Sequence, residues 1–123
     1  MKPVQQTKQR NEVIDATGLT IGRVATRAAV VLRGKDRASF ERHLLPLVNL
    51  RIVNASKMKI APAKFRGKTY ARYSGYPGGL QFENLESKIA RLGYESVLKL
   101  AIKRMIPSNK LRPRLLTNLK IEN

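Results

Sequence analysis

The sequence predicts an α/β domain, because a strand, a helix and a second strand follow one another in its first half. The apolar run VIDATG, residues 13–18, ends in a glycine turn and predicts the first strand. The helix is expected to begin after Thr20, which suits an N-cap, and to stop at Gly34. Residues 50–54, LRIVN, predict the second strand. A helical connection between two strands favours their parallel pairing.

The second half of the chain predicts one more strand and two helices. KTYARYS, residues 68–74, alternates bulky residues as a strand does. Asn84 suits the N-cap of a helix that Gly93 terminates. Apolar residues then recur at helical spacing from Tyr94 to Met105, which predicts a second, amphipathic helix. The segment that follows, around Pro113, has a broken pattern typical of turns.

The balance of charge restricts the class of partner. The 123 residues include 25 Lys and Arg against 8 Asp and Glu, a formal net charge of +17. A compact domain with this surplus repels itself unless a polyanion neutralises it. Nucleic acid is the usual polyanion, and an anionic membrane surface is the second candidate. Residues 1–12 are polar and basic and predict a flexible N-terminal arm, followed by a single domain over residues 13–123. The sequence shows no membrane-spanning run and no signal peptide.

The residues for catalysis or metal binding are scarce. The chain has one histidine, His43, and no cysteine. A lone histidine in a polar loop is more often a surface residue than a base, and transition-metal sites need several such ligands. The eight carboxylates lack the spacing of a calcium loop, and the glycine segments match neither phosphate-binding motif. We therefore expect no catalytic residue, no metal, no cofactor and no small-molecule substrate.

The segment YARYSGYPGG, residues 70–79, combines aromatic rings, a fixed cation and bare backbone without a carboxylate. Its glycines leave amide groups uncovered, and such amides form anion-binding nests. Tyr73 and Tyr76 are predicted to stack on bases, whereas strand alternation predicts that Tyr70 faces the core. Arg72 can pair with phosphate or stack on a base. The alternative is an ordinary Pro-Gly-Gly turn flanked by half-buried tyrosines.

Two further features are zones of cations without any acid, over residues 57–72 and 99–114, and a weaker patch lies at residues 33–37. Such runs are often merely solvated faces, but here they continue into irregular segments, which suits phosphate contact. Their dispersal, without a known nucleic-acid-binding motif, favours a protein wrapped by folded RNA. The residues predicted to contact RNA are Arg23, Arg27, Lys35, Arg37, Lys59, Lys64, Arg66, Lys68, Arg72, Tyr73, Ser74, Gly75, Tyr76, Gly78, Gly79, Lys103, Arg104, Lys110, Arg112 and Arg114.

Five segments, in order, resemble the bacterial-type ribosomal protein thirteen family of the large subunit. They are VIDATGLTIGRVAT at 13–26, LRGKDRASFERH at 32–43, IVNASK at 52–57, YSGYPGG at 73–79 and AIKRMIPSNKLRPRLLTNLKI at 101–121. Apolar residues 45–48 stand where the family has an acidic turn, and we expect them to face a neighbouring protein.

The resemblance implies a three-layer α/β/α fold on a small, largely parallel, four-stranded sheet. It also implies a structural role in the large ribosomal subunit, with direct binding to 23S-type ribosomal RNA, a part in early subunit assembly and neighbouring ribosomal proteins as partners. The location would be the cytoplasmic ribosome or an organellar one, without catalysis or membrane association. A free-standing nucleic-acid chaperone or DNA-compacting protein remains the alternative, and an RNA-directed enzyme is a weaker one.

Overall fold

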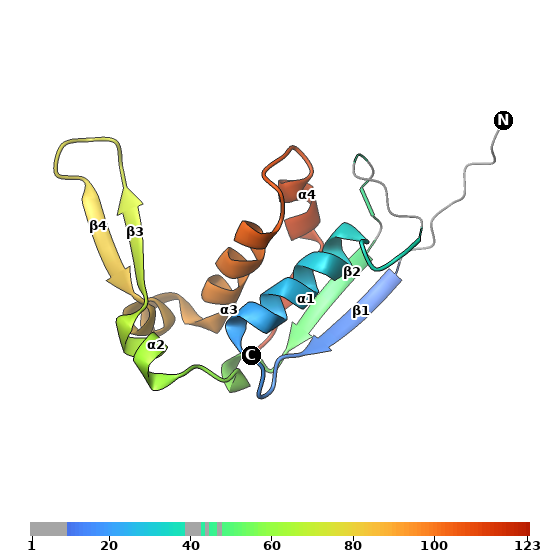
Figure 1. Cartoon of the computed structure of the whole chain (residues 1–123), viewed down its shortest axis with the longest axis horizontal. Helices are drawn as coiled ribbons and strands as arrows, with labels where there is room; N and C mark the ends of the chain where they lie inside the picture. Colours follow the sequence, from blue (N-terminus) through green and yellow to red (C-terminus); the bar gives the residue numbers. More distant parts are fainter. Residues whose placement is uncertain (1–9, 39–42, 44, 47) are drawn as a thin grey trace.

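A computed structural model describes residues 10–38, 43, 45, 46 and 48–123 (Figure 1). Its elements, in chain order, are β1 (Arg10–Asp15), α1 (Ile21–Arg33), β2 (Val48–Val53), the 3-10 helix η1 (Ala55–Lys57), α2 (Pro62–Gly67), β3 (Thr69–Tyr73), β4 (Leu80–Asn84), α3 (Leu85–Met105), α4 (Arg112–Thr117) and β5 (Leu119–Ile121). Helices and strands are interspersed along the chain, and the predicted α/β class is confirmed.

The main sheet is parallel and has the strand order β1-β2-β5. In its register Ile14 lies beside Ile52, and Ile52 lies beside Ile121. All three side chains are buried. The predicted strand, helix and parallel strand in the first half of the chain are therefore confirmed, with α1 as the connection between β1 and β2.

The helix α1 begins and ends where the sequence predicts. The Thr20 hydroxyl accepts a hydrogen bond from the Arg23 amide at 3.4 Å, which satisfies one of the free donors of the first turn. The Gly34 amide closes the other end by donating to the carbonyls of Val30 and Val31. Between these caps, Val24 and Leu32 are among the side chains that α1 buries against the sheet and α3. Burying one such side chain stabilises a fold by about 1.5–3 kcal/mol.

The helices of the described chain cover one face of the main sheet. Along β2, Leu50 and Ile52 are buried, whereas Asn49 and Arg51 are exposed. The face with the exposed residues extends to the neighbouring strand β1, where Val13 lies in register with Arg51 and is 62% exposed. The buried side chains of α1, α3 and α4 share a single core with the covered face. Within the described residues the arrangement therefore has two layers, and the predicted second layer of helices is not seen there.

The predicted four-stranded sheet is wrong in its strand count. The structure instead has the three-stranded main sheet and a separate antiparallel pair, β3–β4, which we call the hairpin. The hairpin stands at the far end of the molecule from β1 (Figure 1). A strand inside a parallel sheet is normally apolar on both faces, but β3 buries only part of Tyr70. The third strand of the main sheet is β5, a segment of three residues that the sequence analysis did not predict.

Gly93 interrupts α3 at the predicted position. Its φ of 82° and ψ of 175° are not helical, so α3 is two helices joined by a kink rather than a single rod. The Asn84 side chain caps the start of the first half by accepting from the Ser87 amide at 2.8 Å. The second half carries the predicted apolar stripe, of which Val97, Leu98 and Ile102 are buried.

Two boundaries and one surface differ from the predictions. β1 begins at Arg10, so residues 10–12 pair with β2 instead of belonging to the arm; the rest of the predicted arm, residues 1–9, lies outside the described residues. A helix, α4, occupies part of the segment predicted as turns, because proline is tolerated in the first turn of a helix. Leu45 packs partly against the core and Val48 is buried in β2, so these two residues do not form an outward apolar turn; Leu47 is not among the described residues.

Candidate nucleic-acid interface

The hairpin presents the aromatic residues that the sequence analysis singled out. Tyr73 is the last residue of β3 and pairs with Leu80, the first residue of β4. Its side chain is 63% exposed, and that of Tyr76, in the connecting loop, is 75% exposed. Both rings are therefore accessible to a partner, as stacking requires. The alternative of half-buried tyrosines beside the turn does not hold for these two residues.

The loop between the strands is held by short contacts that need glycine. The Gly79 amide donates to the Tyr76 carbonyl at 2.9 Å. A Cβ added at Gly79 would lie 2.0 Å from the Ser74 hydroxyl oxygen, so any other residue would displace Ser74. Gly75 and Gly78 have positive φ values of 89° and 74°. All of the loop except Gly79 is exposed, which leaves its backbone open to close approach by a ligand.

Tyr70 anchors the inner face of the hairpin to the body of the molecule. It packs against the edge of the core, as strand alternation predicted, and three cations surround its ring. Lys88 Nζ lies 4.4 Å from the ring centroid, Lys68 Nζ lies at 5.6 Å and Arg104 Cζ at 5.9 Å. Burial raises the pKa of the Tyr70 hydroxyl, and the charge of Arg104 opposes this rise. Three positive charges therefore lie together at the base of the hairpin: Lys68 directly before β3, and Lys88 and Arg104 from the two halves of α3.

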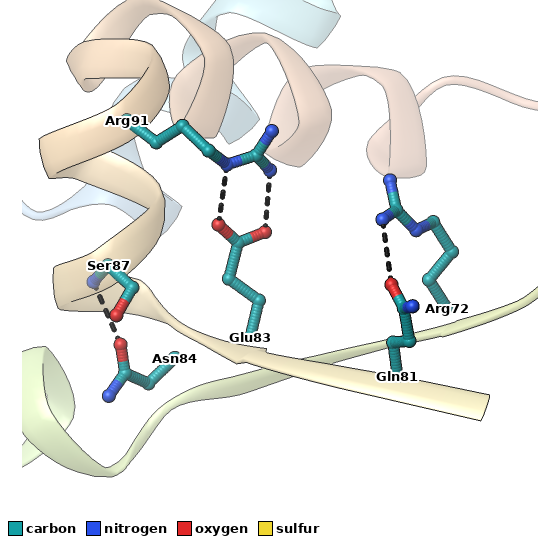
Figure 2. A network of polar contacts seen from close by, with 6 residues as sticks. All are labelled: Arg72, Gln81, Glu83, Asn84, Ser87 and Arg91. Atoms are coloured by element: carbon teal, nitrogen blue, oxygen red, sulfur yellow. Dashed lines mark hydrogen bonds and ion pairs between the residues drawn. The ribbon is translucent and has the colours of Figure 1, made fainter. Parts of the chain in front are cut away.

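The polar contacts of this inner face neutralise the only carboxylate of the hairpin strands (Figure 2). Arg91 on α3 donates two hydrogen bonds to Glu83 on β4, at 3.0 and 2.8 Å. These bonds hold the pKa of the Glu83 carboxyl below its ordinary value. Arg72 donates to the side chain of Gln81, its partner across the strands, at 3.0 Å. Figure 2 shows Arg72, Gln81 and Glu83 extending from the same side of the hairpin.

The predicted phosphate-contacting cations fall into separate regions of the surface. Lys64, Arg66 and Lys68 lie on or directly after α2, which contacts both β4 and α3 at the base of the hairpin. Arg23 and Arg27 lie on α1 near its contact with α3, where the Thr26 hydroxyl meets Met105. The remainder are Lys35 and Arg37 after α1, Lys59 after η1, Lys103 and Arg104 on α3, Lys110 before α4, and Arg112 and Arg114 on α4. They therefore come from several helices and the segments between them rather than from a single element.

These cations are nevertheless available to a partner. Within the described residues, ion pairs join Arg10 to Glu12 and Asp36, Arg51 to Glu122, Arg91 to Glu83 and Lys120 to Glu122. None of the cations predicted to contact phosphate takes part in these pairs. All of them are exposed except Arg112, which is half-buried. Their charge is therefore not cancelled within this part of the protein.

The described residues hold no group of three or more His, Cys, Asp or Glu side chains that could bind a metal ion. His43 is an exposed turn residue. As far as the structure describes the chain, its helices are too short or too polar to cross a bilayer.

Residues 9–121 match the sequence profile of the family described as Ribosomal protein L13. The chain belongs to the L13 family. The matched segment contains all the elements from β1 to β5, including the hairpin and its loop. The resemblance inferred from five short segments is thereby confirmed.

Three bacterial relatives show how much of the chain the likeness covers. Each is named large ribosomal subunit protein uL13. The protein of Orientia tsutsugamushi (strain Ikeda) is 42% identical over 113 residues, which are 89% of this chain and 70% of the relative. Those of Symbiobacterium thermophilum and Thermus thermophilus are each 41% identical over 117 residues, or 95% of this chain and 81% and 83% of the relatives.

Two features of the candidate interface were not predicted from the sequence. Lys88 lies closer to the Tyr70 ring than either predicted cation, because α3 begins directly after β4, the strand that pairs with β3. Phe82 is 67% exposed on β4 beside the predicted stacking residues. Its position next to Ala71 could have been inferred from a hairpin register centred on the Pro-Gly-Gly turn, had β4 been recognised.

Proposed function

We propose that this chain is a structural constituent of the large ribosomal subunit that binds 23S-type ribosomal RNA directly and supports early subunit assembly. The observation that carries the proposal is family membership combined with a net charge of +17, much of it on exposed cations without carboxylate partners. The relatives are named as large-subunit proteins, and the chain matches them over most of its length. Its place would then be the ribosome, beside other large-subunit proteins and without a catalytic role.

The mechanism is neutralisation of phosphate charge combined with recognition of RNA shape. Cations spread over α1, α2, α3 and α4 can contact RNA segments that approach from different directions. Each contact releases counterions from the RNA, which favours binding, and reduces the repulsion between converging RNA helices. The glycine loop at the hairpin tip carries little side-chain bulk, so RNA backbone can approach its amides closely. Phosphate contacts of this kind fix position rather than read sequence.

The first experiment measures where the protein is found and how salt affects its binding. In a sucrose gradient the chain should sediment with large subunits at one copy per subunit. Its affinity for a large-subunit ribosomal RNA fragment should fall steeply as salt rises, because six to ten phosphate contacts would cost about 10³- to 10⁵-fold between roughly 50 and 200 mM salt on duplex DNA, and somewhat less on single strands. A free-standing nucleic-acid chaperone would instead bind unrelated sequences equally well and remain outside the subunit peak.

Matched charge variants test which surface is responsible. Lys64→Gln with Arg66→Gln removes two charges near the hairpin and should weaken RNA binding and reduce its salt dependence. Arg51→Gln with Lys120→Gln removes two charges from the exposed face of the main sheet, where both side chains already approach Glu122. This control should bind nearly as the parent does. Equal losses in the two double variants would mean that total charge, rather than the proposed surface, determines binding.

A further inference from the structure

The outer face of the hairpin carries a row of exposed apolar side chains that the phosphate contacts do not explain. Tyr73 lies opposite Leu80, and Ala71 lies opposite Phe82. Paired residues, and residues two apart on one strand, share a face, so these four side chains form one surface. Tyr73, Leu80 and Phe82 are 63%, 53% and 67% exposed. The intervening residues Arg72, Gln81 and Glu83 extend together from the other side (Figure 2).

Two aromatic rings of this surface lie diagonally across neighbouring strands. Tyr73 pairs with Leu80, and Phe82 is two residues beyond Leu80 on the same strand. Diagonal positions of this kind have Cα atoms about 7–8 Å apart, which is within reach of aromatic side chains. The two rings therefore share one face of the strand pair within reach of each other, with Leu80 opposite Tyr73. Strand backbone holds them more firmly than a loop would.

The charge around the outer face selects the partner. Residues 57–82 contain cations and no carboxylate, and the nearest carboxylate along β4, Glu83, lies on the inner face in its bonds with Arg91. A partner of this surface must therefore combine negative charge with flat or apolar groups. Single-stranded RNA does so, since each nucleotide carries a phosphate and a base with a π-face. Exposed aromatic residues on β-sheets bind unpaired RNA bases in this way.

We propose that the outer face of the hairpin is a stacking platform for unpaired RNA bases, in which Tyr73 and Phe82 are the stacking rings. The inference rests on the proposed RNA binding and deepens it, because it names single-stranded, unpaired nucleotides as the part of the RNA that the hairpin contacts. Tyr76, in the loop, can extend the stack toward the tip. Duplex RNA does not fit the platform, since its bases are paired and stacked on one another.

The test separates stacking from charge by using two RNA probes with the same number of phosphates. One is a short single-stranded oligoadenylate, and the other is the same strand with abasic sites. The full-length protein should bind the oligoadenylate more tightly than the abasic strand, by at least about fivefold for each stacked ring, since base stacking on an aromatic residue contributes roughly 1–3 kcal/mol. Phe82→Ala should reduce this preference by the share of one ring, about fivefold, and leave affinity for the abasic strand unchanged. Leu92→Ala, at a residue of α3 that is 47% exposed, is the matched control and should change neither affinity.

Two conservative variants decide whether the ring is needed for its π-face or only for its apolar surface. Phe82→Tyr keeps the ring and should keep the preference for bases. Phe82→Leu keeps an apolar side chain without a π-face and should lose the same share of the preference as Phe82→Ala. If Phe82→Leu binds oligoadenylate as the parent does, the surface does not stack bases, and an apolar contact with a neighbouring protein is the better explanation.

The remaining outcomes distinguish this inference from the proposed function. Salt-sensitive RNA binding with no difference between the two strands would overturn the platform and leave the proposed function standing. Failure to bind either strand or ribosomal RNA would overturn both. Because Phe82 is exposed, its variants should unfold at the temperature of the parent, so a change in affinity can be assigned to the surface.

Discussion

At the scale of single residues, strand alternation gives two neighbouring tyrosines different roles. Tyr70 and Tyr73 are three positions apart on β3, so they face opposite sides of the hairpin. Tyr70 packs against the core with Lys88, Lys68 and Arg104 around its ring, whereas Tyr73 is exposed. Each cation near an aromatic face contributes about 0.5–1 kcal/mol at a partly exposed site. Tyr70 is therefore a structural residue and Tyr73 a candidate contact.

This division predicts opposite outcomes for the two alanine variants. Tyr70→Ala removes the ring that attaches the hairpin to α3 and should lower the free energy of unfolding by roughly 1–3 kcal/mol. Tyr73→Ala removes an exposed ring and should change it by no more than about 0.5 kcal/mol, while weakening RNA binding. Chemical denaturation measures the first effect and a binding titration the second. Tyr70→Phe is the control, because it keeps the ring and should stay close to the parent. If Tyr73→Ala also destabilises the protein by more than about 1 kcal/mol, Tyr73 belongs to the core.

Residues whose roles depend on near neighbours were predictable, and those that depend on tertiary contacts were not. Thr20 and Asn84 cap helices through amides three residues away, so the local sequence contains the whole signal. The position of Tyr70 followed from alternation within one strand. Lys88 reaches the Tyr70 ring from a different element, the first half of α3, and Arg104 reaches it from beyond the kink at Gly93, whose angle no local pattern encodes. Phe82 was missed for a similar reason, since its place on the platform depends on pairing between two strands.

At the scale of elements, the kink in α3 allows one helical segment to serve two parts of the molecule. The first half contacts the hairpin through Arg91 and Glu83, and the second half packs its apolar stripe into the main core. Gly93 makes the change of direction with a φ of 82° and a ψ of 175°, a combination that is essentially restricted to glycine. A Cβ at this position would meet no atom within 4 Å, so the restriction comes from the backbone alone.

Gly93→Ala should therefore destabilise the protein without any steric clash. The strained backbone costs about 1–3 kcal/mol, which thermal or chemical unfolding can detect. Gly22→Ala is the matched control: Gly22 lies within α1, has ordinary helical φ and also has no atom within 4 Å of an added Cβ. That substitution should be neutral or stabilise by up to about 1 kcal/mol, because alanine has the higher helix propensity. Equal effects of the two substitutions would show that α3 can straighten at no cost.

Element type was predictable from sequence wherever a segment was long and strongly patterned. The caps and apolar spacing of α1, and the stripe of α3, left little ambiguity. β5 and β4 were missed because a strand of three residues, and one with exposed Leu80 and Phe82, lack the buried alternation that identifies a strand. The predicted number of strands in the sheet was wrong for the same reason. The sequence of β3 is typical of a strand, but only its pairing with β4 shows that it lies outside the main sheet.

At the scale of the whole molecule, low pH should destabilise the folded state in two ways, through its carboxylates and through its excess of cations. Asp15, Glu83 and Glu122 each have a carboxyl pKa below the ordinary value. The causes are hydrogen bonds, from the backbone and side chain of Thr17 to Asp15, from Arg91 to Glu83 and from Arg51 to Glu122. A carboxyl with a depressed pKa stabilises the folded state above its unfolded pKa, and this contribution is lost as the pH falls through the lower folded pKa. Protonating all eight carboxylates also raises the net charge from +17 to +25, since 17 plus 8 is 25, which increases self-repulsion.

The free energy of unfolding of the isolated protein should therefore decrease as the pH falls below about 4.5, the ordinary value for a Glu carboxyl. Sodium chloride separates the two causes, because salt screens repulsion between distant exposed charges but does not restore a hydrogen bond to a protonated carboxyl. Added salt should recover part of the loss at low pH, and Glu83→Gln should have a shallower pH dependence than the parent because one depressed carboxyl is gone. Denaturation curves over a series of pH values, each at low and high salt, measure both the loss of the carboxylate hydrogen bonds and the charge repulsion. A stability that stays constant down to pH values well below 4 would mean that neither the carboxylate contacts nor the surplus charge affects the folded state, and the need for a polyanionic partner would then lose its physical basis.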